Sequence, residues 1–289
     1  MKTAIIGSKG FLGKNFMEAL PEALGFHRDN ASDFTQIDAT NWPWSEEYDL
    51  IVHCALSSDL VEQSQIDSGI IRWWRDYQPH ATLITFGTDA CYTDDDHHTE
   101  SYYLKGIPHK KWRYYAESKR AMYYLLLGIE RPSFHFVLTS MFGPGFDLSD
   151  DHLMHSLIKK IVDGLTYGTG VSVGSPGQMK EVLYAPDVVK NVMEFVGLDP
   201  APHARIFNLG SVKKSGLTVK EIVQKICDEV GFQLDKIKFG DTVYSLGPNT
   251  KWLDSSQAMG MIDYSDTDWS DALKPTISYY MSVQECKSL

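Results

Sequence analysis

A tyrosine and a lysine stand four residues apart at Tyr115 and Lys119, a spacing that places both on one face of a helix. A neighbouring ammonium lowers the pKa of a phenol from its ordinary value of about 10, which lets the phenol exchange a proton near neutral pH. Thr88 follows the apolar run 81–86 and offers a hydroxyl to orient a reacting oxygen. These three side chains predict acid–base chemistry on an oxygen.

A glycine-rich loop directly follows the apolar run 3–6 and begins a helical stretch. Its glycines permit a tight turn and let a pyrophosphate approach the backbone, and the helix N-terminus attracts the phosphates. We therefore predict a dinucleotide site here; the alternative is an ordinary strand–helix turn. The residues assigned to the cofactor are Gly7, Lys9, Gly10, Phe11, Leu12 and Gly13.

The choice of dinucleotide depends on the segment 25–29, at the end of the second expected strand. Arg28 and Lys9 are two cations that suit a ribose 2′-phosphate, which favours NADP(H). Asp29 keeps NAD(H) open, because an acid at this place binds the ribose 2′-hydroxyl. The alternative for both cations is a solvated surface role. Asp38 is assigned to the adenine, with a turn acid at a strand end as its alternative.

Short apolar runs alternate with helical stretches in the first half of the chain, which predicts a Rossmann-type, doubly wound parallel α/β sheet. Gly and Pro punctuate shorter segments after position 145. We expect a NAD(P)-binding domain over 1–145 and a smaller α/β substrate-binding region over 146–289, interleaved where the chain crosses back near 180–210. The expected strands are 3–6, 50–54, 81–86 and 134–138, and the expected helices are 11–20, 70–77, 115–127 and 219–230.

Composition narrows the possible partners. Lys and Arg total 27 against 38 Asp and Glu, a net charge of −11, which argues against a general nucleic-acid binder. No apolar run approaches the ~18 residues of a membrane span. Four cysteines without CxxC spacing fit a reducing, cytoplasmic compartment. The acidic and histidine residues of 94–98 are interpreted as a solvated loop, so no metal is predicted.

Several segments together resemble the NAD(P)-dependent sugar-nucleotide epimerase/dehydratase/reductase family, the extended short-chain dehydrogenases/reductases, and within it most closely the GDP-L-fucose synthases. The resemblance implies Thr88, Tyr115 and Lys119 as a catalytic triad. It also implies hydride transfer between a nicotinamide and a sugar carbon, and a homodimer formed through two helices per subunit. The segments are 7–13, 49–55, 88–92, 115–119, 139–145, 180–187 and 207–210.

Departures from the family pattern narrow the chemistry. Ala90 stands where sugar dehydratases of the family carry a glutamate base and fucose synthases carry a cysteine. Cys91 is one residue away, and a shift of one residue along a strand points a side chain to the opposite face. His152 matches the family's epimerisation acid but lacks a partner base. The expected reaction is therefore NADPH-dependent reduction of a 4-keto sugar nucleotide.

The same resemblance supplies the remaining assignments. Ala55 is assigned to the cofactor. Ser140 replaces a common Asn, and Lys180 replaces an Arg that usually binds the substrate diphosphate; solvated charge is the alternative for the lysines. Two other functions stay open: an NAD-dependent nucleotide-sugar 4-epimerase and a non-catalytic dinucleotide-binding regulatory protein. The residues assigned to the substrate are Asp89, Ser140, His152, Lys160 and Lys180.

Overall fold

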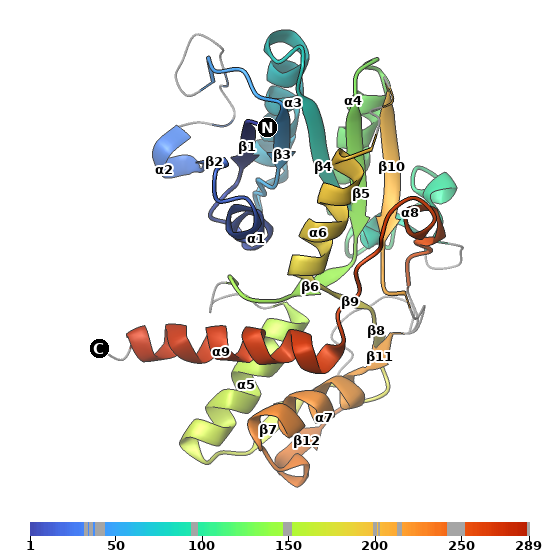
Figure 1. Cartoon of the computed structure of the whole chain (residues 1–289). Coiled ribbons are helices and arrows are strands. Elements are labelled where there is room, and N and C mark those ends of the chain that lie inside the picture. The colour runs from blue at the N-terminus through green and yellow to red at the C-terminus, as the bar shows by residue number, and fades with distance from the viewer. Residues whose placement is uncertain are drawn as a thin grey trace.

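A six-stranded sheet forms the upper part of the molecule in Figure 1, a computed structural model. Its order is β10-β5-β4-β3-β1-β2, and all neighbouring strands are parallel. The strands are β1 (Thr3–Ile6), β2 (Leu24–Phe26), β3 (Leu50–His53), β4 (Thr82–Thr88), β5 (Ser133–Leu138) and β10 (Ala204–Leu209). The structure describes residues 1–31, 34, 37, 44–93, 98–146, 152–198, 201, 203–212, 216–241 and 252–287.

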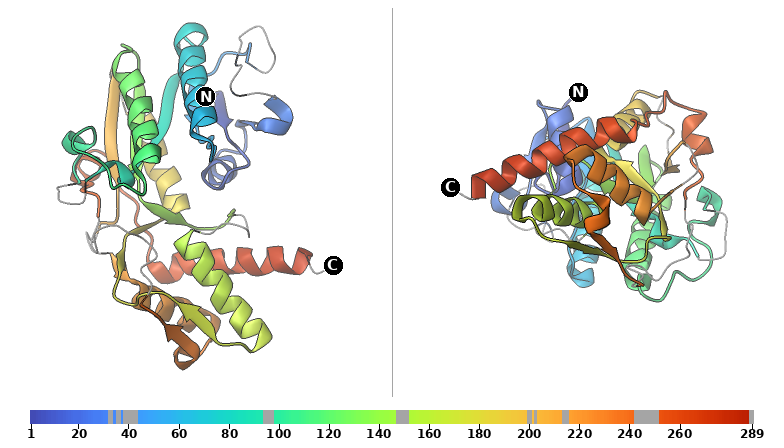
Figure 2. Two further views of the ribbon diagram at one scale, coloured as in Figure 1. Left: turned by 180° about the vertical axis from the view of Figure 1, so that it is seen from behind. Right: turned by 90° about the horizontal axis from the view of Figure 1, so that it is seen from below.

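Helices cover both faces of this sheet because its strands are apolar on both sides. Along β1, Ile6 packs on one face and Ile5 on the other, as the alternation of side chains in a strand requires. Figure 2 shows α3 and α4 on the face opposite α6. The helices are α3 (Leu60–Tyr77) and α4 (Arg113–Leu127) on one face, and α1 (Phe11–Ala19) and α6 (Ala185–Val196) on the other.

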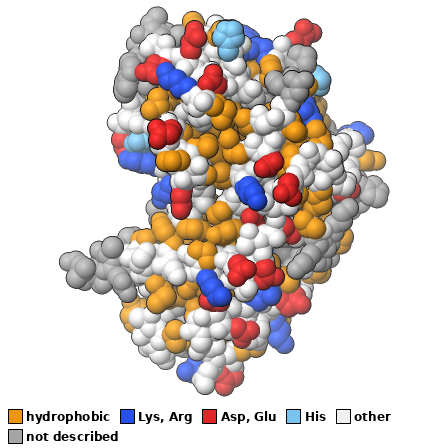
Figure 3. Space-filling view, viewed as in Figure 1, with side chains coloured by type: hydrophobic (Ala, Val, Ile, Leu, Met, Phe, Trp, Pro, Cys, Tyr) orange, Lys and Arg blue, Asp and Glu red, His pale blue; other side chains and the backbone are white. Residues whose placement is uncertain are grey.

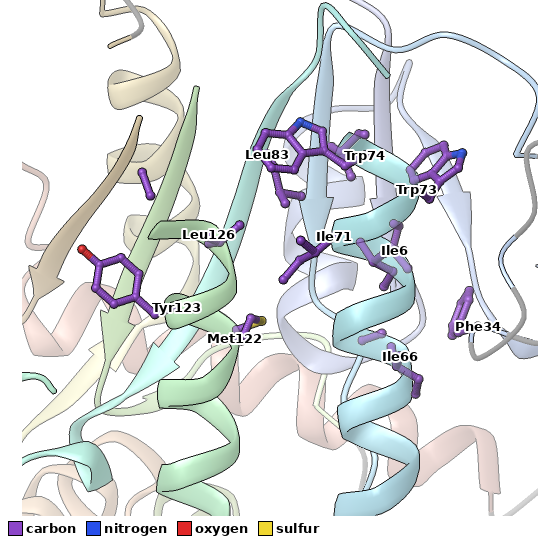
Figure 4. Packing of buried hydrophobic residues seen from close by; sticks show 14 of the residues in the cluster. Ile6, Phe34, Ile66, Ile71, Trp73, Trp74, Leu83, Met122, Tyr123 and Leu126 are labelled. Carbon is purple, nitrogen blue, oxygen red and sulfur yellow. The ribbon is translucent and has the colours of Figure 1, made fainter. Parts of the chain in front are cut away.

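The core under α3 and α4 contains large aromatic and aliphatic side chains. Trp73 and Trp74 are fully buried there, and Figure 4 shows them with Ile66 and Ile71 of α3 and Met122 of α4. Burying each such side chain contributes about 1.5–3 kcal/mol, so this packing fixes α3 against α4 and the sheet. The two helices carry the candidate site residues on this face.

A second hydrophobic core lies in the lower part of Figure 1. Thr218 and Glu221 form a capping box at the start of α7, the helix expected over 219–230, and Gly231 ends that helix at a φ of +72°. The elements of this part are α5 (Leu153–Tyr167), β7 (Val171–Val173), β8 (Met179–Lys180), β11 (Leu217–Thr218), α7 (Val219–Val230), β12 (Ile237–Phe239) and α9 (Trp269–Lys287).

Short elements join the two parts. Strand β6 (Ser140–Phe142) pairs in parallel with β9 (Val182–Tyr184) between them. Strand β10, from the second half of the chain, forms an edge of the first sheet. The domain boundary expected at residue 145 stays a prediction. The other short helices are α2 (Arg28–Ala31), η1 (Asp89–Cys91), η2 (Glu100–Tyr102), η3 (Leu234–Lys236) and α8 (Ser256–Met259).

Candidate functional site

The glycine loop lies at the carboxyl end of β1, against the loop after β3. A Cβ on Gly7, whose φ is +87°, would stand 2.5 Å from the backbone nitrogen of Ala55. A Cβ on Gly13 would stand 2.2 Å from the carbonyl oxygen of Gly7. Both positions therefore exclude any side chain, and they bring three backbone segments into close approach.

This geometry fits a dinucleotide. Helix α1 begins after Gly10, which has no side chain to bind the N–H groups of the first turn. Those donors and the helix dipole suit a pyrophosphate. The loop also lies where strand order reverses, with β2 and β3 on opposite sides of β1, and parallel sheets bind ligands at such switch points. Figure 3 shows the surface hollowed between the sheet and α9.

Both cations expected at the ribose end form ion pairs. The Arg28 guanidinium donates to both carboxylate oxygens of Glu62, at 2.8 and 2.7 Å. The Lys9 ammonium donates to Asp29 at 2.5 Å, and this ion pair holds the pKa of the Asp29 carboxyl below its ordinary value. These side chains are largely exposed, so both pairs are open to exchange with a ligand phosphate. Asp38 lies outside the described residues.

Two of the three expected catalytic side chains, those of Thr88 and Tyr115, lie close together at the carboxyl end of β4. Thr88 is the last residue of that strand, and its hydroxyl lies close enough to the Tyr115 phenol to act on the pKa of that phenol in the lowering direction. Tyr115 lies in the first turn of α4, and Lys119 follows one turn later with its side chain buried. The charge of Lys119 acts on Cys54, Asp67 and His135, so the ammonium lies toward the sheet and α3.

The pKa of Tyr115 departs from the sequence-based expectation. Lys119 was expected to lower it; instead, burial and nearby acidic groups raise the pKa of the Tyr115 phenol to about 12. The acidic groups are Cys91, Asp89 and Asp67, against which the Thr88 hydrogen bond acts in the lowering direction. The physical reason is that the phenol is buried beside acidic groups, while the charge of Lys119 acts on the buried carboxylate of Asp67. The phenol is accordingly protonated near neutral pH.

Residues 90 and 91 carry no candidate base. Ala90 has no polar side chain. Its backbone N–H donates to the Thr88 hydroxyl at 3.2 Å. The Cys91 thiol is fully buried and donates to the carbonyl oxygen of Ala116 at 3.3 Å. Burial raises the pKa of this thiol to about 12, so it stays protonated.

A bridge of hydrogen bonds joins the catalytic edge to the expected substrate residues. The Thr139 hydroxyl donates to Asp89 at 3.4 Å and to the carbonyl oxygen of Glu181 at 3.2 Å. Ser140 follows Thr139 and begins β6. Lys180 ends β8 and directly precedes Glu181. Three of the assigned substrate residues therefore lie on adjoining segments.

The two other assigned residues lie on α5. His152 is the N-cap residue of this helix, and Lys160 follows about two turns later. Helix α5 packs against β6 and β7. The substrate roles of His152 and Lys160 stay predictions.

Two buried carboxylates near the site were not predicted from the sequence. Glu181 accepts backbone N–H donors from Ser211 and Leu253, and burial raises its pKa to about 7. Asp67 binds His53, the last residue of β3. One available signal was the pair Gln63 and Asp67, polar residues four apart on the buried face of α3.

A family model described as the NAD dependent epimerase/dehydratase family matches residues 3–210, from β1 through the end of β10. The chain belongs to this family. The match covers the glycine loop and the Thr88, Tyr115 and Lys119 site described above, so it establishes an NAD(P)-dependent enzyme family, whose fold the resemblance correctly predicted. None of the curated proteins matches the chain significantly.

Solved structures of the epimerase/dehydratase fold align over nearly the whole chain. A GDP-L-fucose synthetase from Naegleria fowleri bound to NADP is 18% identical, with a TM-score of 0.85 over 98% of this chain and 94% of that one. A GDP-6-OMe-4-keto-L-xylo-heptose reductase from C. jejuni is 14% identical, with a TM-score of 0.81 over 98% of each chain. A Thermus thermophilus UDP-glucose 4-epimerase with NAD is 14% identical, with a TM-score of 0.76 over 97% and 99%. These likenesses establish the shared fold.

Metal and membrane features are absent from the described part of the chain. Its histidine, cysteine and acidic residues form no group that could hold a metal ion, and residues 94–97 lie outside it. Among the helices in that part, none is long and apolar enough to cross a bilayer.

Proposed function

We propose that this protein reduces the carbonyl of a 4-keto sugar nucleotide with NADPH. The observation that carries the proposal is the position of the Tyr115 phenol, which lies beside Thr88 at a strand end and is protonated near neutral pH. Reduction of a ketone needs a proton donor at the oxygen where charge develops, and a protonated phenol supplies one. The glycine loop two strands away supplies the site for the hydride carrier.

Each residue has one role in this proposal. The nicotinamide, when bound, supplies the hydride. Tyr115 donates its proton to the oxygen of the substrate, and the Thr88 hydroxyl binds the same oxygen. Lys119 binds the ribose hydroxyls of the cofactor. Ala90 and the buried Cys91 offer no base that could abstract a proton beside the carbonyl.

The substrate would lie between the two parts of the molecule. Lys180 and Lys160 are the candidate partners of its diphosphate, and Asp89 and Ser140 line the approach from the catalytic edge. A lysine provides charge without the two-pronged geometry of an arginine, so binding of the diphosphate depends on charge more than on shape. Members of the fold that act on GDP-sugars make a GDP-linked 4-keto-6-deoxyhexose the first candidate.

An NAD-dependent 4-epimerase is the second candidate. It is favoured by one observation, the carboxylate of Asp29 beside Lys9 after β2, where an acid selects the ribose 2′-hydroxyl of NAD. An epimerase returns its hydride to the sugar, so it consumes no cofactor over a full turnover. This redox balance separates the two candidates.

We also propose pairing of two copies through α3 and α4. Helix α4 exposes large apolar side chains, Tyr114, Tyr124, Leu125 and Leu127, and Val61 is exposed on α3. Light scattering of the purified protein tests the proposal. A dimer is expected, and a monomer at micromolar concentration would overturn it.

The reaction is tested by incubating the protein with NADPH or NADH and a panel of GDP-, dTDP-, UDP- and CDP-linked 4-keto-6-deoxyhexoses. Loss of one NADPH per reduced sugar is expected with at least one of them. Interconversion of 4-epimers without cofactor loss would establish the epimerase instead. Binding of NADPH with no turnover on any sugar nucleotide would favour a non-catalytic protein.

A further inference from the structure

Glu62 contacts one of the two cations assigned to the ribose end of the cofactor. It lies in the first turn of α3, and both of its carboxylate oxygens accept hydrogen bonds from the same nitrogen, Nη2 of Arg28, at 2.8 and 2.7 Å. Arg28 is the candidate partner of a ribose 2′-phosphate. The residue that holds this guanidinium therefore bears on the choice of dinucleotide.

The contact between Arg28 and Glu62 spans the two sides of the glycine loop. On one side, the backbone N–H of Gly7 donates to the carbonyl oxygen of Phe26 at 2.8 Å, and Arg28 follows two residues later. On the other side, Gly7 approaches the backbone of Ala55, in the loop that leads from β3 into α3. Strand β1 and its loop lie between β2 and β3 (Figure 1). The contact therefore joins the segments after the two flanking strands, where ligands of parallel sheets bind.

The Glu62 carboxylate is held in place independently of Arg28. The Ser57 hydroxyl donates to Oε2 of Glu62, and it accepts the backbone N–H of Asp59 at 3.1 Å. The Asp59 carboxylate in turn accepts the backbone N–H of Glu62 at 3.1 Å. The Glu62 side chain is 34% exposed, against 62% for Arg28. The acid is thus the fixed partner, and the more exposed arginine is the one that can turn from it to a ligand.

The ribose end of the site holds two cations and two acids. Lys9 pairs with Asp29, and Arg28 pairs with Glu62. A 2′-phosphate is an anion, so it must draw a cation away from its acid before it gains the full charge-assisted contact. A ribose 2′-hydroxyl is neutral and makes no such demand. Asp29 is 74% exposed, so water screens its charge more than that of Glu62.

We propose that Glu62 is a specificity-determining residue: its anchored carboxylate competes with the 2′-phosphate of NADPH for the Arg28 guanidinium. The competition limits the preference of the protein for NADPH over NADH. This inference rests on the cofactor site of the proposed function, and it adds to that site a residue from α3 that sequence reasoning did not assign.

The test measures the dissociation constants of NADPH and NADH by fluorescence titration in wild type and Glu62→Gln. The amide keeps the size of the side chain but loses the charge that holds Arg28. E62Q should bind NADPH about fivefold more tightly, the value of one exposed ion pair, and NADH within about twofold of wild type. An unchanged NADPH constant would overturn the proposal. A change confined to NADH would also overturn it, because Glu62 would then bind the ribose hydroxyl.

Two further variants separate the direct contact from a general effect of charge. Asp59→Asn removes a carboxylate from the start of the same helix, and the amide can still act as its cap, so NADPH binding should change by less than about twofold. In the Arg28→Ala background, Glu62→Gln should no longer tighten NADPH binding, because the group for which the acid competes is gone. An equal gain with and without Arg28 would overturn the proposal.

These titrations need neither substrate nor turnover, so they separate this inference from the proposed reduction. NADPH binding that does not respond to E62Q would contradict the inference alone. Binding without turnover on any sugar nucleotide would contradict the reduction, and the effect of E62Q should still be found. Failure of the wild type to bind either dinucleotide would contradict both.

Discussion

Asp67 and Glu181 are both buried carboxylates, yet their pKa values shift in opposite directions. Asp67, on α3 in the cofactor half, is bonded to His53 and faces Lys119, which hold its pKa low despite burial. Glu181, at the junction between β8 and β9, binds only backbone N–H groups and faces Asp89 and Asp266, so burial raises its pKa to about 7. Burial is similar in the two regions, with exposed fractions of 3% and 5%.

The difference shows that neighbouring charge, rather than depth, determines which carboxylate ionises. In the cofactor half, the Asp67 carboxylate therefore stays ionised near neutral pH. The junction with the substrate half contains Glu181, whose pKa of about 7 lies within the physiological range. Both regions share neighbours with Tyr115: Asp67 and Asp89 raise the pKa of its phenol, and Asp89 also raises the pKa of Glu181.

The largest expected effect comes from removing the Tyr115 hydroxyl. Tyr115→Phe should lower kcat by about 10³-fold, the scale of a lost proton donor, with little change in NADPH affinity. Cofactor titration and steady-state kinetics measure the two quantities. The exposed neighbour offers a matched control, Tyr114→Phe, which should retain normal turnover. A kcat for Tyr115→Phe within a few-fold of wild type would remove the tyrosine from the mechanism.

Breaking the buried pair should cost much more stability than breaking an exposed one. His53→Leu leaves the Asp67 carboxylate buried without its partner, and it should lower the free energy of unfolding by about 3–5 kcal/mol. Arg28→Ala removes the exposed pair with Glu62 and should change that free energy by no more than about 1 kcal/mol. Urea denaturation of both variants measures the contrast, and equal losses would refute it.

The raised pKa of Glu181 predicts that its contribution to the free energy of unfolding falls as the pH rises. Its raised pKa means that the folded protein holds a proton which the unfolded chain releases between pH ~4.5 and pH ~7. Its contribution to stability is therefore present below that range and is lost as the pH rises through about 7. Glu181→Gln should remove about 2 kcal/mol of the decline between pH ~5 and ~8. Unfolding curves with the same pH slope in variant and wild type would count against this account.

The smallest effect concerns the exposed ion pairs of Lys9 and Arg28, near the expected ribose of the cofactor. Unlike the buried His53–Asp67 contact, these pairs are free to change partners. Arg28→Ala should weaken NADPH binding by about tenfold, the value of one lost charge-assisted contact, and leave NADH binding unchanged. Fluorescence titration with both cofactors gives the ratio. An equal loss for NADPH and NADH would assign Arg28 to a general surface role.

Much of the fold could be predicted from local pattern. The expected strand 3–6 and helix 219–230 match β1 and α7, because apolar periodicity, a capping box and a terminal glycine are local signals. The structure also brings Thr88 and Tyr115 together, since the ends of parallel strands and the helices that follow meet at one edge. Helix α3 begins ten residues before the expected 70–77, at a cap by Asp59.

The buried carboxylates could not be predicted in the same way. His53 and Asp67 meet only through the packing of α3 on β3, and Glu181 gains its partners from segments 30 and 72 residues away. The direction of the Tyr115 pKa shift was wrong for the same reason. A Tyr-x-x-x-Lys spacing reports the nearest cation, but it carries no information about carboxylates that tertiary packing places behind that cation.

The central claim, hydride transfer to a substrate carbonyl with Tyr115 as proton donor, is tested most directly with NADPH carrying deuterium at both C4 positions. The product of wild-type turnover should hold one deuterium on the reduced sugar carbon for each NADPH oxidised. Product without deuterium, formed while NADPH remains intact, would contradict the account.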